Sequence, residues 1–116
     1  MHEMGLATEI VRIVAESIPG DMVDPKVERV NLKVGKLAAV VPHSLKFCFD
    51  IAAKDGPVEG AELIIEEIGV SARCNDCKNR WDIDEPAFQC PRCNGGSIEV
   101  LTGRELDIES IELADE

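Results

Sequence analysis

Apolar residues recur at the spacing of one helix face near the start of the chain. They are Leu6, Ile10, Ile13, Val14 and Ile18. Charged residues occupy the other side, at Glu9, Arg12 and Glu16. A repeat of three to four residues is typical of an amphipathic helix, and a proline-glycine pair ends such a pattern. The sequence therefore predicts a first helix that stops at Pro19 and buries one face.

A repeat of two residues then replaces the helical one. Three apolar residues alternate with two polar ones over residues 30–34, which predicts a half-buried strand. A short apolar connection leads to Pro42, and proline is favoured in the first turn of a helix. The residues from Ser44 to about Lys54 again place apolar side chains on one face. We expect a second helix there.

Two later segments have the two-residue repeat of strands. Apolar residues alternate with more polar ones between residues 61 and 68. Near the end of the chain, the apolar positions of residues 106–108 are out of phase with those of residues 111–113. A bulge near Ser110 would bring both pairs onto one face. The sequence thus predicts a second strand and an irregular final strand.

These elements predict an α+β fold. Two helices cover a three-stranded sheet, and a zinc-ribbon-like module is inserted before the last strand. The predicted helix-and-sheet domain comprises residues 1–69 and 104–116, and the module comprises residues 70–103. The 116 residues of the chain have room for one compact domain with a small appendage. A segment shorter than about 40 residues rarely folds on its own core, so the module needs a metal ion or a covalent cross-link.

The predicted module contains four cysteines in two CxxC pairs. Cys74 pairs with Cys77 and Cys90 pairs with Cys93, with twelve residues between the pairs. Each CxxC turn places two sulfurs on one side of a tight loop, so two turns supply a tetrahedral site with Zn–S distances of about 2.3 Å. Such a site has no open coordination position and is structural. Asn94-Gly95-Gly96 would allow a positive-φ turn after the second pair.

Sulfur tetrahedra also hold iron, so a rubredoxin-like electron carrier is an alternative to a zinc site. The visible absorption spectrum separates the two metals, because Zn²⁺ is colourless. Between the cysteine pairs, residues 79–83 and 86–89 are predicted to form short strands. Trp81 and Phe88 are expected to cover the sulfurs. The fifth cysteine, Cys48, lies in the second predicted helix, where we expect a small buried side chain.

The charge of the chain is strongly negative. Twelve Lys and Arg residues against 23 Asp and Glu residues give a net charge of −11. This charge repels phosphate backbones and disfavours nucleic-acid binding. No apolar run reaches the roughly 18 residues of a membrane span, and the start of the chain lacks the features of a signal peptide. We expect a soluble cytoplasmic protein whose partners include neither nucleic acid nor membrane.

Cysteine and histidine usage argues against catalysis. An odd number of cysteines in a cytosolic chain favours metal ligation over disulfides. The two histidines, His2 and His43, lie far apart in the sequence, and the clustered cysteines are committed to a closed site. No nucleophile–base pair is evident, so no enzyme is predicted. A purely structural zinc-ribbon scaffold is the remaining alternative.

The amino terminus offers a second type of metal site. The α-amine of Met1, the backbone nitrogen of His2 and the His2 imidazole can close two fused chelate rings around one ion. The backbone nitrogen of Glu3 can supply a fourth donor. Four nitrogens in a plane suit Ni²⁺ or Cu²⁺. Taken alone, however, a histidine at position two is more often part of a solvated terminus.

Several motifs along the chain match one family pattern. They are Met1-His2-Glu3 before an apolar helix, Val34-Gly35 at a strand end, Leu45-Lys46-Phe47, Glu59-Gly60-Ala61-Glu62-Leu63, the paired CxxC turns and Gly103-Arg104-Glu105-Leu106. Together they resemble the HypA family, which inserts nickel during maturation of [NiFe]-hydrogenase. The resemblance runs essentially from end to end. Its most specific part is the combination of the first three residues with the paired CxxC turns.

This resemblance implies a nickel metallochaperone. In the family, the residue that matches His2 is the essential nickel ligand and the residue that matches Glu3 supports it. The four matching cysteines hold structural zinc. The implied partners are a nickel-delivery GTPase and the hydrogenase large subunit, with urease maturation proteins in some bacteria. The chain departs from the family pattern at Pro42-His43-Ser44 and at Gly56-Pro57, which contain no proposed ligand.

Overall fold

The computed structural model describes residues 2–22, 24–84 and 88–114. Its elements are α1 (Glu3–Ser17), β1 (Val27–Gly35), the 3₁₀ turn η1 (Lys36–Ala38), α2 (Pro42–Ala52), β2 (Glu62–Ile68), β3 (Val70–Cys74), β4 (Arg80–Ile83), β5 (Ile98–Thr102) and β6 (Leu106–Leu113). These form two compact units. The first comprises Met1–Lys33, Val40–Glu66 and Asp107–Glu116, and the second comprises Val34–Ala39 and Glu67–Leu106.

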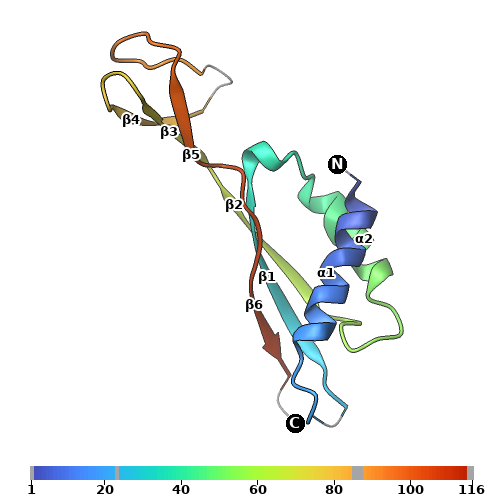
Figure 1. Ribbon diagram of the computed structural model, residues 1–116. Coiled ribbons are helices and arrows are strands. Elements are labelled where there is room, and N and C mark those ends of the chain that lie inside the picture. The colour runs from blue at the N-terminus through green and yellow to red at the C-terminus, as the bar shows by residue number, and fades with distance from the viewer. Residues whose placement is uncertain (1, 23, 85–87, 115–116) are drawn as a thin grey trace. The chain divides into compact units, whose positions relative to one another are not determined.

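The first unit contains a three-stranded sheet in the order β2-β1-β6, with both helices on one face (Figure 1). The strands β1 and β2 run in the same direction and are joined by α2, as in a crossover unit (Figure 1). The end of β6 lies beside the start of β1, where the Ala114 N–H donates to the Lys26 carbonyl at 2.9 Å. Helix α1 packs against α2. The predicted α+β fold is confirmed.

The core of the first unit lies between the helices and the sheet. The helices bury Ala7, Ile10, Val14, Leu45 and Phe49, and the strands and their connections bury Val27, Val30, Leu32, Ala53, Val58, Ala61 and Leu63. The buried positions of α1 follow the predicted helical repeat. Ile13 is the exception, because 39% of its surface is exposed. The helix face that meets the core is therefore narrower than the apolar pattern indicated.

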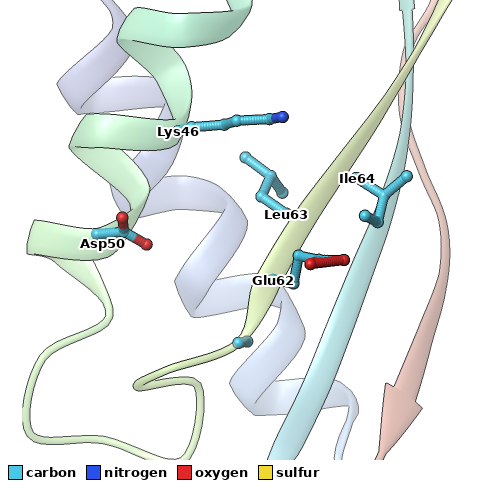
Figure 2. Close-up of a pocket in the computed structure, with 6 residues that line it drawn as sticks. Lys46, Asp50, Glu62, Leu63 and Ile64 are labelled. Atoms are coloured by element: carbon cyan, nitrogen blue, oxygen red, sulfur yellow. The ribbon is translucent and has the colours of Figure 1, made fainter.

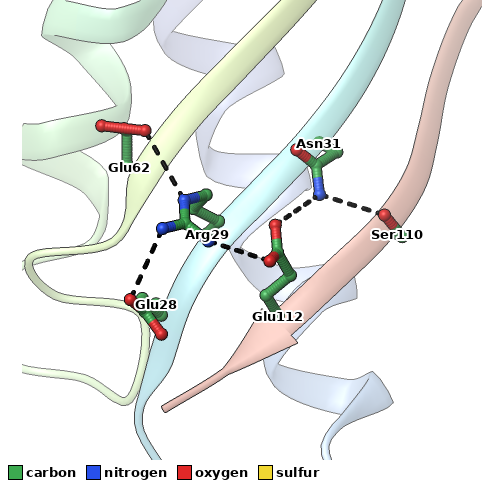
Figure 3. A network of polar contacts seen from close by, with 6 residues as sticks. All are labelled: Glu28, Arg29, Asn31, Glu62, Ser110 and Glu112. Carbon is green, nitrogen blue, oxygen red and sulfur yellow. Dashed lines mark hydrogen bonds and ion pairs between the residues drawn. The ribbon is translucent and has the colours of Figure 1, made fainter.

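The opposite face of this sheet is polar and cross-linked by ion pairs (Figure 3). Arg29 on β1 contacts Glu62 on β2 at 3.7 Å and Glu112 on β6 at 2.9 Å. The Asn31 side-chain amide donates to Ser110 at 3.0 Å and to Glu112 at 3.1 Å. Residues of β1 thus alternate between an apolar core side and a polar outer side, as the two-residue repeat predicted.

The second unit contains the antiparallel sheet β4-β3-β5. In β3, Val70, Ala72 and Cys74 are buried and alternate with half-buried residues. The register of β3 with β5 shifts between Ser71 and Ala72, which marks a bulge. The predicted strand over 79–83 is confirmed as β4. No separate strands were predicted at the positions of β3 and β5. The unit also contains η1, in place of the plain apolar connection that was predicted.

Some finer predictions differ from the structure or lie beyond it. Of the predicted strand over 86–89, residues 86 and 87 lie outside the described residues, and Phe88 and Gln89 form no strand. Phe88 is 43% exposed, and Cys48 is half-buried where a buried side chain was expected. The predicted boundaries at 69/70 and 103/104 remain a prediction. The compact units place residues 34–39 with the cysteine segment.

Candidate metal centre

The four paired cysteines converge on one point. Cys74 ends β3, and the ligand sulfurs of all four cysteines lie within 4.8 Å of one another. The Cys74 and Cys93 sulfurs are 3.5 Å apart, and the Cys77 and Cys90 sulfurs are 3.6 Å apart. A tetrahedral site with Zn–S bonds of about 2.3 Å has edges of about 3.8 Å. The thiols are therefore already spaced for a single ion.

The two CxxC turns have the same backbone hydrogen bonds. In the first turn, the Cys77 N–H points at the Cys74 sulfur at 3.5 Å, and in the second the Cys93 N–H points at the Cys90 sulfur at 3.5 Å. The residue after each pair forms a further hydrogen bond to the first cysteine of that pair. The Lys78 N–H donates to the Cys74 carbonyl, and the Asn94 N–H donates to the Cys90 carbonyl. This repetition shows that both pairs are shaped by local chain geometry.

The positive-φ position of each turn is the residue after its second cysteine. These residues are Lys78, with φ 65°, and Asn94, with φ 61°. The positive-φ turn predicted over residues 94–96 is therefore confirmed, at Asn94. Asparagine adopts this region more easily than most side chains do. Gly95 serves a packing role, because a Cβ atom there would lie 3.2 Å from the Cys93 sulfur.

Backbone N–H groups favour the thiolate form of each cysteine, but the net shift in pKa is downward for one cysteine of each pair and upward for the other. The Cys77 N–H lowers the pKa of Cys74. Burial raises the pKa of Cys90, but the N–H groups of Cys93 and Arg92 and two neighbouring thiols outweigh burial and bring this pKa to about 6. For Cys93, the Gly95 N–H favours the thiolate, yet the Cys74 thiol and burial prevail and raise the pKa to about 12. Metal binding at neutral pH should therefore displace a proton from Cys93, whereas Cys90 is already largely a thiolate.

The donor set fits a structural metal. Four sulfurs leave no coordination position for a substrate, and tetrahedral sulfur sites are typical of zinc or iron. Cys74 and Cys90 are buried, whereas Cys93 is exposed. In the described part of the chain, this is the one group of three or more His, Cys, Asp or Glu side chains close enough to share an ion.

The amino-terminal candidates lie at the start of α1. Met1 lies outside the described residues. His2 is the residue that caps α1 and is exposed, and its side chain makes no capping hydrogen bond. Glu3 is the first residue of the helix. His43, the second histidine, is exposed in the first turn of α2.

No helix in the described ranges combines the length and the apolarity that a membrane span requires.

The structure also identifies a residue that the sequence did not single out. Asp76, inside the first CxxC turn, has a carboxylate oxygen 3.0 Å from the position of a Cβ atom on Gly95. The second turn thus packs against the first turn at a glycine. Nothing in the local spacing of Asp76 indicated this contact.

Comparison with known proteins gives a consistent family assignment. The family model described as hydrogenase/urease nickel incorporation, metallochaperone, hypA matches residues 1–113. The hydrogenase maturation factor HypA of Desulfosudis oleivorans is 55% identical over 113 residues, covering 97% of this chain and 98% of the relative. That of Desulfatibacillum aliphaticivorans is 50% identical over 115 residues, covering 99% of this chain and 88% of the relative.

Solved structures agree in fold. The solution structure of the Ni metallochaperone HypA from Helicobacter pylori has a TM-score of 0.67 at 21% identity, with full coverage of both chains. A second solution structure, of a HypA protein, has a TM-score of 0.74 at 22% identity, covering 100% of this chain and 98% of the other. At these identities the likeness concerns the fold. With the family model and the close sequence relatives, it confirms the predicted assignment: the chain belongs to the HypA family.

Proposed function

We propose that this protein is a nickel metallochaperone that binds Ni²⁺ at its amino terminus and delivers it for maturation of [NiFe]-hydrogenase. The observation that carries the proposal is the match of residues 1–113 to a family described by nickel incorporation. The exposed His2 at the start of α1 supports it, because a carrier site must be reachable by an acceptor. The closed sulfur site supports it as well. A site with four cysteine ligands suits a structural ion, so the ion to be delivered is expected at a different site.

The proposed nickel ligands come from Met1, His2 and Glu3. The α-amine, the His2 imidazole and the backbone nitrogens of His2 and Glu3 form a set of four nitrogens that suits Ni²⁺. These two backbone nitrogens belong to the cap and first residue of α1. The first N–H groups of a helix have no partner within it. Ligation therefore removes no helical hydrogen bond, so nickel can bind and leave without unwinding α1.

For Cys74, Cys77, Cys90 and Cys93 we propose structural zinc. Iron at this centre would instead support a rubredoxin-like electron carrier. The two cases differ in the visible absorption spectrum of the purified protein, because only iron absorbs there. Elemental analysis should find one zinc per chain. With a closed sulfur site and no catalytic pair proposed, the function does not require enzymatic activity.

The proposed partners follow from the family. They are a nickel-delivery GTPase and the hydrogenase large subunit, with urease maturation proteins as a further destination. We place the protein in the cytoplasm, where such an acceptor is assembled. The net charge of −11 disfavours nucleic acid as a partner.

Calorimetric titration of Ni²⁺ into untagged, zinc-loaded protein tests the nickel site. His2→Ala should weaken nickel binding by well over tenfold, because it removes the imidazole and opens a chelate ring. His43→Ala is the matched control, since it removes the other exposed histidine, and it should leave the affinity unchanged. One extra residue before Met1 should also weaken binding, because it consumes the α-amine. Unchanged affinity in His2→Ala would favour the purely structural scaffold.

A further inference from the structure

A groove lies between α2 and β2 in the first unit (Figure 2). Its volume is about 310 Å³, and it is lined by Lys46, Asp50, Ala61, Glu62, Leu63 and Ile64. Lys46 extends from α2 toward β2, and the Leu63 side chain lies between them (Figure 2). Leu63 and Ala61 are buried. The groove therefore has an apolar floor beside a strand and a polar wall on a helix.

The strand in this groove is at the edge of its sheet. In the order β2-β1-β6, β2 bonds to β1 on one side, and within the described residues no strand lies on its other side. Alternate N–H and C=O groups of such an edge point away from the sheet and can pair with another chain. Edges are often protected by charged side chains, proline or a bulge. The sequence of β2, ELIIEEI, contains no proline, and its charged residues are all glutamates.

Charge decides which chain suits this edge. Glu62 and Glu66 are exposed on β2. The first unit as a whole contains sixteen Asp and Glu residues against six Lys and Arg residues. Pairing of β2 with β2 of a second copy would place acidic strands and acidic units side by side, and like charges on paired strands are destabilising. A partner strand with basic side chains would be attracted to this acidic edge, whereas a second copy of β2 would be repelled by it.

The helix wall complements such a strand. Lys46 and Asp50 are one turn apart on α2, and neither forms an ion pair within the part of the chain that the structure describes. Lys46 is placed to donate to a carbonyl of a chain lying in the groove. Glu62 and Glu66, on the side of β2 opposite to Leu63, are placed to accept from basic side chains of that chain. Apolar side chains of the bound strand would meet Leu63 and Ala61.

We propose that the β2 edge binds an extended segment of a partner protein, in which basic and apolar residues alternate, as a fourth strand of the sheet. Backbone hydrogen bonds would supply affinity and the alternating side chains specificity, as in other cases of strand addition. The surface uses neither His2 nor the cysteines, so the proposal stands apart from the nickel site.

The test uses the full-length, metal-loaded protein and labelled peptides of the same seven-residue length as β2. One peptide alternates lysine and valine, a second alternates glutamate and valine, and a third is the lysine peptide methylated at alternate backbone nitrogens. Fluorescence anisotropy measures binding, and amide hydrogen exchange locates it. The lysine peptide should bind, and its binding should protect amides within residues 62–66. The other two peptides should bind at least tenfold more weakly.

Matched variants separate the β2 edge from the general acidity of the unit. Glu66→Lys should weaken binding of the lysine peptide about tenfold, because it replaces an electrostatic attraction with a repulsion at the β2 edge. Glu59→Lys makes the same charge change outside the groove and should change the affinity less than about twofold. Circular dichroism checks that both variants fold. Equal binding of the methylated peptide, or protection elsewhere than β2, would overturn the proposal. A dimer in light scattering whose β2 amides are already protected would assign the edge to a second copy.

Discussion

At the scale of single residues, Gly95 is constrained by the cysteine centre that it borders. A Cβ atom at this position would lie 3.2 Å from the Cys93 sulfur and 3.0 Å from an Asp76 carboxylate oxygen. The Gly95 carbonyl also accepts the Cys90 N–H at 3.0 Å. The Asp76 side chain can turn away, but a metal-bound sulfur cannot. A side chain at Gly95 therefore acts on the ligand geometry.

Replacement of Gly95 with alanine should weaken metal retention about tenfold, because the Cys93 sulfur must shift to make room. Gly96→Ala is the matched control, since nothing lies within 4 Å of its Cβ position. Competition for the bound metal with a coloured chelator measures the difference. Equal retention by both variants would show that the turn absorbs the added methyl group.

At the scale of elements, the end of β1 approaches the chain after β5 closely. The Gly35 N–H donates to the Glu105 carbonyl at 2.7 Å, and the Leu37 N–H donates to the Gly103 carbonyl at 2.7 Å. A Cβ atom at Gly35 would overlap the backbone of Gly103. Gly103 itself has φ +119°, which side chains rarely adopt. Both glycines therefore allow two backbone segments to meet inside the second unit.

Gly35→Ala should lower the free energy of unfolding by about 2–3 kcal/mol, because the added methyl group meets backbone that cannot turn aside. Gly69→Ala introduces the same methyl group where nothing lies within 4 Å, and it should change stability little. Urea unfolding of both variants, followed by circular dichroism, measures the two free energies. A loss in Gly69→Ala as large as that in Gly35→Ala would refute the steric explanation.

Also at this scale, the polar face of the first sheet should make stability depend on pH. The hydrogen bond from Asn31 lowers the pKa of Glu112, burial opposes it, and Arg29 adds to the lowering. A carboxylate whose pKa is lower in the folded state stabilises the fold above its unfolded pKa. This contribution disappears as the pH falls from about 5 through the folded pKa. Acid should therefore weaken the contacts between β1 and β6.

Glu112→Gln should reduce the loss of stability between pH 7 and pH 3, because the variant has no carboxylate to protonate at this position. Urea unfolding at each pH gives the difference from the wild type. Glu59→Gln, which removes an exposed carboxylate outside the network, should retain the wild-type pH dependence. If Glu112→Gln also retained the wild-type pH dependence, the contacts of Glu112 with Asn31 and Arg29 would make no measurable contribution to stability.

At the scale of the whole molecule, the two units differ in what holds them together. The first unit buries apolar side chains from two helices and a sheet. In the second unit, the buried side chains in the described residues are Val34, Val70, Ala72, Cys74 and Cys90. Two of these five are proposed metal ligands. So small an apolar core does not support an independent fold, and the metal must supply the remaining stability.

Removal of the metal should therefore unfold the second unit and leave the first intact. After chelation, amide hydrogen exchange should accelerate in residues 67–106, while the buried positions of α1 and α2 stay protected. Cys74→Ser should give the same result without chelator, and Cys48→Ser, a cysteine outside the cluster, should not. Unchanged protection of residues 67–106 after metal loss would show that the second unit folds on its apolar contacts alone.

Much of the fold was predictable where short-range patterns are decisive. The repeats around Ile10 and Leu32 identified a helix and a strand, because a helix face and a strand face each impose a fixed spacing. The CxxC turns identified Cys74 and its partners, because each pair is formed by one local loop. Ile13 was predicted on the buried face but is exposed. Its exposure depends on how closely α2 and the sheet approach α1, which the spacing of apolar residues does not report. The amino-terminal ligands stay a prediction.

The sequence by itself determined the local elements, the four clustered cysteines and the family, because each is encoded by residues near one another or by motifs read in order. The tertiary structure alone decided the strand order β2-β1-β6, the open edge of β2, the contact of Gly35 with Gly103 and the packing of Asp76 against Gly95. Those features join segments that lie apart in the sequence. Such contacts depend on the assembled packing, which no single spacing along the chain reports.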